Sequence, residues 1–79
     1  MGREKSWKVI FTFHTTTQAM KMERKAQQMG KIGRLIPVPR QISAGCGMAW
    51  IAPKENGDEL REWVVREGIE VEGEYDLFM

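Results

Sequence analysis

Cysteine is almost absent from this chain, since Cys46 is the only one among 79 residues. One cysteine cannot form a disulfide within the chain, and secreted domains this small usually carry several. We therefore expect a protein of the reducing cytoplasm. One cysteine and one histidine, His14, also cannot complete a structural zinc site, so we expect no metal.

Long apolar runs and catalytic motifs are also missing. No apolar run approaches the ~20 residues that span a bilayer, and no signal segment opens the chain, so we expect no membrane association. The sequence has no glycine-rich phosphate loop, no paired-carboxylate constellation and no serine-nucleophile motif. We therefore expect no cofactor, and a stand-alone enzyme is disfavoured.

Charge is balanced overall but unevenly distributed. The net charge is +1, with +7 in residues 1–45 and −6 in residues 46–79. No basic cluster interleaves with aromatic residues, so we expect no nucleic-acid partner. The two halves neutralise each other either within the fold or across a homodimer.

Hydrophobic periodicity predicts one α+β domain over residues 1–79, in which residues 1–6 form a short, basic, flexible extension. Strand periodicity covers residues 7–13, 35–38, 48–52 and 69–72. Helical segments begin at Thr15, where Thr15-x-x-Gln18 is a capping box, and at Asn56. Gly30 and Gly68 end them.

The order strand–helix–strand–strand–helix–strand predicts a ferredoxin-like two-layer sandwich. Two right-handed βαβ units in one antiparallel sheet give the strand order 4-1-3-2, with two helices on one face. Pro37 removes a backbone donor, so the second strand belongs at an edge, as this order requires. Ile10 points to the second face of a central strand, and an uncovered apolar residue there suggests a homodimer.

This topology brings the loop around Cys46 to one end of the sheet. The third strand starts beside the end of the first strand, where the first helix also starts, so Cys46 and His14 should lie together. The helix N-terminus and Arg40 would favour the thiolate, which is the reactive form. Gly45 and Gly47 would leave room for a bulky partner beside the sulfur.

Each of these residues also has an ordinary structural explanation. A lone cysteine is often a small buried apolar residue. His14 and Arg40 can be solvated loop residues, and Ser43 can simply cap a turn.

A motif in the same loop resembles that of a known family. The pattern Pro-Arg-x-Ile-Ser-x-x-Cys-Gly is met by Pro39, Arg40, Ile42, Ser43, Cys46 and Gly47. The sequence resembles the selenium/sulfur carrier protein-like family of small prokaryotic proteins, from the strand ending at Phe13 to the Gly68-Ile69 step.

This resemblance implies a ferredoxin-like domain whose Cys46 carries sulfur or selenium as a persulfide or selenosulfide. Arg40, Ser43, Gly45 and Gly47 would support the thiol, with a lesser role for His14. The partners would be a donor, such as a cysteine desulfurase, and an acceptor protein. The alternative is a non-catalytic regulatory or adaptor module in which Cys46 is structural or redox-sensing.

Overall fold

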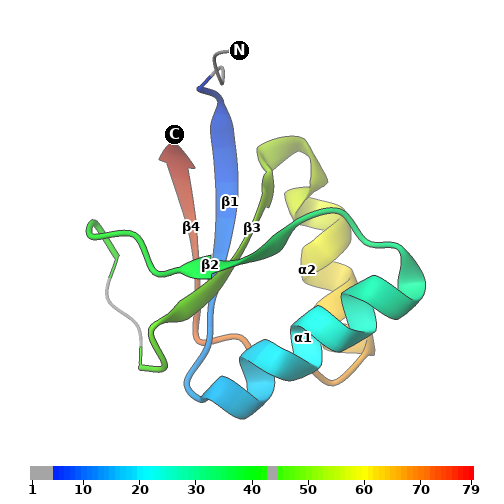
Figure 1. Cartoon of the computed structure of the whole chain (residues 1–79). Helices are drawn as coiled ribbons and strands as arrows, with labels where there is room; N and C mark the ends of the chain where they lie inside the picture. Colours follow the sequence, from blue (N-terminus) through cyan, green and yellow to red (C-terminus); the bar gives the residue numbers. More distant parts are fainter. Residues whose placement is uncertain (1–4, 43–44) are drawn as a thin grey trace.

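The computed structural model describes residues 5–42 and 45–79, which form a four-stranded antiparallel sheet and two α-helices (Figure 1). The elements are β1 (Trp7–Thr12), α1 (Thr16–Met29), β2 (Arg34–Pro37), β3 (Met48–Pro53), the 3-10 turn η1 (Lys54–Asn56), α2 (Gly57–Arg66) and β4 (Gly73–Phe78). The sheet order β2-β3-β1-β4 is the predicted order counted from the other edge. The predicted α+β class and strand order are therefore confirmed.

Both helices pack on one face of the sheet, where the main core lies (Figure 1). Phe11 and Trp50 are directly opposite each other on β1 and β3, and both are buried. The helices cover them with two apolar stripes, which consist of Ala19, Met22 and Ala26 on α1 and Leu60, Trp63 and Val64 on α2. Strand alternation and helical spacing thus direct these side chains into one interface.

The predicted start and end of α1 are confirmed, as is Gly68 just after the end of α2, where its φ is 71°, but the predicted Asn56 cap is corrected. The Thr15 hydroxyl accepts a hydrogen bond from the Gln18 amide at 3.3 Å. Gly30 ends α1 in the left-handed conformation, with φ of 66°. Asn56 makes no side-chain cap, because the chain enters α2 directly from the η1 turn and its backbone already follows a helical path there.

The last strand lies later in the chain than residues 69–72, so that prediction is wrong. Ile69 is buried in the core between the helices and the sheet, and the Glu70 amide donates to Gln18 Oε1 of α1 at 3.0 Å. The alternation in residues 69–72 therefore reflects packing of a connecting segment. Pairing with β1 begins only at Gly73.

The second face of the sheet is covered by the chain itself. Ile10 is fully buried beside Ile51, and Ile42 packs with them while only 8% exposed. In Figure 1 the segment after β2 lies on the side of the sheet away from the helices. The expectation of an uncovered apolar face at Ile10 is wrong, because residues 38–42 fold back over it. The homodimer itself stays a prediction.

Sheet pairing extends past the ends of β1 and β4. Ser6 and Met79 exchange two backbone hydrogen bonds, at 3.2 and 3.0 Å. The predicted flexible extension is thus tied to the sheet at Ser6, and residues 1–4 lie outside the described residues. Neither α1 nor α2 is long and apolar enough to cross a membrane, and the rest of the described chain adds no such helix.

Candidate functional site

Cys46 lies in the loop before β3, at the end of the sheet where β1 leads into α1. Its side chain is partly buried and packs against the helix-side core. The thiol donates a weak hydrogen bond to the Met48 carbonyl oxygen, with an Sγ–O distance of 3.5 Å. The side chain is therefore held by the protein on one side, while the residue is partly exposed.

Gly45 brings the Cys46 loop against the turn between β1 and α1. A Cβ atom on Gly45 would lie 2.9 Å from the carbonyl oxygen of His14, which is too close for any residue with a side chain. His14 directly precedes Thr15, the N-cap of α1. This contact confirms that Cys46 and His14 lie at the same end of the sheet, as the topology predicted.

Glu72 joins the same two segments through its side chain. One carboxylate oxygen accepts a hydrogen bond from the Gly45 amide at 3.2 Å, and the other lies 3.5 Å from Nδ1 of His14. Sequence reasoning missed Glu72, because it placed residues 69–72 in a strand. No local signal could have revealed its role, since that depends on the path of the connecting segment.

The other predicted site residues are not joined to the thiol. Arg40 is exposed, and within residues 5–42 and 45–79 no hydrogen bond or ion pair joins it to Cys46. The same holds for the free amides of the first turn of α1. Gly47 adopts a left-handed conformation with φ of 79°, so its backbone geometry is sufficient to explain this glycine. Ser43 lies outside the described residues.

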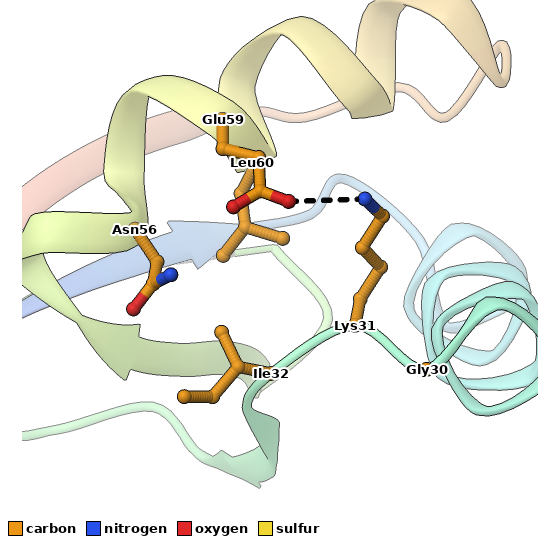
Figure 2. A pocket seen from close by; sticks show the side chains of 6 residues that line it. All are labelled: Gly30, Lys31, Ile32, Asn56, Glu59 and Leu60. Carbon is orange, nitrogen blue, oxygen red and sulfur yellow. Dashed lines mark hydrogen bonds and ion pairs between the residues drawn. The ribbon is translucent and has the colours of Figure 1, made fainter.

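Two surface hollows lie away from Cys46. The first hollow has a volume of about 190 Å³ and lies between the end of α1 and the start of α2. Figure 2 shows the Lys31 ammonium pointing across it to the Glu59 carboxylate. These groups are 3.1 Å apart, and the hydrogen bond and charge of Lys31 lower the pKa of Glu59. The second, of about 260 Å³, lies beside Lys54, Arg61 and the acidic residues of β4.

The described residues contain no cluster of three or more histidine, cysteine, aspartate or glutamate side chains placed to hold a metal ion.

Comparison with known proteins identifies the family. A family model described as "Putative Se/S carrier protein-like" matches residues 8–76, which is nearly the whole chain. The chain belongs to this Se/S carrier family. No curated protein and no solved structure gives a significant match. The family match agrees with the resemblance seen in the motif around Cys46.

Proposed function

We propose that this member of the Se/S carrier family carries a sulfur or selenium atom on Cys46, as a persulfide or selenosulfide, between a donor and an acceptor protein. The observation that carries the proposal is the position of the one cysteine, as a partly exposed thiol in a loop at the end of the sheet. A carrier needs a sulfur that a partner's sulfur can reach, and it needs no substrate pocket of its own. Neither hollow described above includes Cys46.

The proposed transfer consists of two thiol exchanges. In loading, the Cys46 thiolate attacks the outer sulfur of a persulfide on the donor, for example a cysteine desulfurase. A new S–S bond forms at Cys46, the donor's S–S bond breaks, and the donor thiolate leaves. In unloading, a nucleophilic thiolate of the acceptor attacks the outer sulfur or selenium, and Cys46 leaves as a thiolate. Neither exchange needs an external oxidant or reductant.

The hydrogen bond to Met48 bears on how loading begins. A carbonyl oxygen can accept a hydrogen bond from a thiol but not from a thiolate. Loss of the proton therefore releases the Cys46 sulfur from Met48 and frees it to turn toward the exposed side of the loop. The loading step would then take place at the surface of the protein.

The proposal includes a ferredoxin-like fold and a prokaryotic cytoplasmic location. The element order, the sheet order and the placement of both helices on one face support the fold. A single free cysteine supports a reducing compartment, in which a persulfide can be exchanged.

An adaptor module of this fold can dock a partner through the open face of its sheet. Residues 38–42 cover Ile10 and Ile51 on that face, so less apolar surface is left there for docking. This observation favours the carrier over the adaptor.

Loading of the reduced protein by glutathione persulfide, followed by intact mass spectrometry, tests the proposal without requiring the natural donor. We expect the wild-type chain to gain one sulfur atom, and Cys46→Ser to gain none. Addition of a small thiol should then remove the sulfur. A wild-type chain that stays unmodified while a free cysteine peptide is loaded in the same mixture would contradict the proposal.

A further inference from the structure

The segment that carries Glu72 is itself firmly attached to the fold. The Glu72 amide donates to the Thr12 carbonyl oxygen at 2.6 Å, and the Glu70 amide donates to Gln18 Oε1 at 3.0 Å. The preceding Ile69 is buried in the core. The Glu72 side chain therefore extends from a backbone whose position is set by both β1 and α1.

The Glu72 carboxylate uses its two oxygens for two different partners. One accepts from the Gly45 amide at 3.2 Å, and the other faces Nδ1 of His14 at 3.5 Å. Hydrogen bonds to a carboxylate are stronger than those between neutral groups. The Glu72 side chain is 28% exposed, so water only partly competes for these contacts, whereas the His14 side chain is 63% exposed.

Gly45 is the residue next to Cys46, and it is held from two directions. Its amide donates a hydrogen bond to Glu72, and the His14 carbonyl oxygen lies 2.9 Å from the position that a Cβ atom on Gly45 would take. These contacts fix the backbone one residue before the thiol. The position of Cys46 against the core then follows from the position of Gly45.

We propose that Glu72 is the positioning residue of the Cys46 site. Its carboxylate, the Gly45 amide and the His14 ring form the Glu72 clamp, which holds the loop so that the sulfur stays partly buried. The role of the clamp in sulfur or selenium transfer rests on the function proposed above, but its effect on the position of Cys46 does not. Glu72 acts through Gly45, and no contact joins it to the sulfur in the described residues.

Three substitutions separate the reach of the side chain from its charge. Glu72→Ala removes the acceptor, Glu72→Asp keeps the charge but shortens the side chain, and Glu72→Gln loses the charge but keeps an oxygen for Gly45. Glu70→Ala is the matched control, because it removes an exposed acid two residues away whose side chain makes no hydrogen bond or ion pair in the described chain.

Two measurements on the reduced proteins test whether the Glu72 clamp holds the loop. They are hydrogen exchange of the Gly45 amide, followed by NMR, and the rate of Cys46 alkylation by iodoacetamide. We expect Glu72→Ala and Glu72→Asp to speed Gly45 exchange about tenfold. In both variants Cys46 should also be alkylated roughly three- to tenfold faster than in Glu72→Gln. Glu70→Ala should keep Gly45 exchange within about twofold of wild type. Glu72→Gln accepts a weaker, neutral hydrogen bond, so its Gly45 exchange should lie between that of wild type and that of Glu72→Ala. Urea midpoints show which variants remain folded. If Glu72→Ala is unfolded, Glu72→Asp alone supplies the test of the shortened side chain.

The proposed clamp is contradicted if Glu72→Ala and Glu72→Asp both show the wild-type rates of Gly45 amide exchange and Cys46 alkylation. It is also overturned if Glu72→Gln behaves like Glu72→Ala, because charge rather than reach would then control the loop. Loading by glutathione persulfide in the same variants separates the two proposals. If wild type does not load while the exchange pattern holds, the carrier function fails and the clamp stands. If wild type loads and the exchange pattern is absent, the clamp fails and the carrier function stands.

Discussion

Gly45 and Gly47 flank Cys46, and the structure gives each a different physical reason to be glycine. Gly45 lies too close to the His14 carbonyl for a Cβ atom, whereas Gly47 has open space around it but a φ of 79°. Both reasons concern the shape of the loop. The sequence pattern suggested clearance for a partner, because the proximity of Gly45 to His14 is visible only in three dimensions.

At the same scale, Glu59 provides an acid-sensitive contribution to stability. The hydrogen bond and charge of Lys31 hold the pKa of Glu59 below its ordinary value of 4.5. Such a carboxyl stabilises the fold above its unfolded pKa, and the contribution is lost as the pH falls through the lower folded pKa. We expect the urea midpoint of wild type to decrease more between about pH 5 and pH 3 than that of Glu59→Gln.

Glu62→Gln is the control for this measurement, since Glu62 is an exposed residue of α2 that forms no ion pair among the described residues. It should keep the pH dependence of wild type. Identical pH profiles for Glu59→Gln and wild type would show that the Lys31–Glu59 contact does not stabilise the fold.

At the scale of elements, the sequence predicted those parts whose burial pattern is local. β1, α1 and β3 each direct a regular set of apolar side chains into the main core, so periodicity located them within one or two residues. The connection to β4 has the same alternation, yet its Ile69 is buried by tertiary packing outside any strand. A pattern of four residues cannot distinguish these cases, and the error concealed Glu72.

The segment after β2 provides a test of this packing, because Ile42 covers Ile10 and Ile51 on the second face of the sheet. Ile42→Ala should lower the free energy of unfolding by about 2 kcal/mol, the lower end of the range for deleting a buried isoleucine side chain. The uncovered apolar surface should also increase self-association, measured by light scattering. Ile32→Ala is the control, since Ile32 is 47% exposed. Equal stability of the two variants would mean that Ile42 does not cover the sheet.

Over the whole molecule, ion pairs within one chain join the two oppositely charged halves of the sequence. These pairs are Lys25–Glu67 at 3.2 Å and Lys31–Glu59 at 3.1 Å. The acidic residues of β4 have partners of their own, in the pairs Lys54–Asp76 and Arg61–Glu74. The apolar Ile10, which suggested a homodimer, is covered by residues of the same chain. Light scattering of the wild-type protein tests the homodimer directly.

Whether Cys46 carries sulfur or selenium in the cell is tested most directly by the intact mass of the protein isolated from its own cells without reductant. We predict that part of the wild-type protein is heavier by one sulfur or selenium atom, that a thiol reductant removes this mass, and that Cys46→Ser isolated in the same way never shows it. Wild-type protein found only with an unmodified thiol, or with the same added mass on Cys46→Ser, would contradict a carrier role for Cys46.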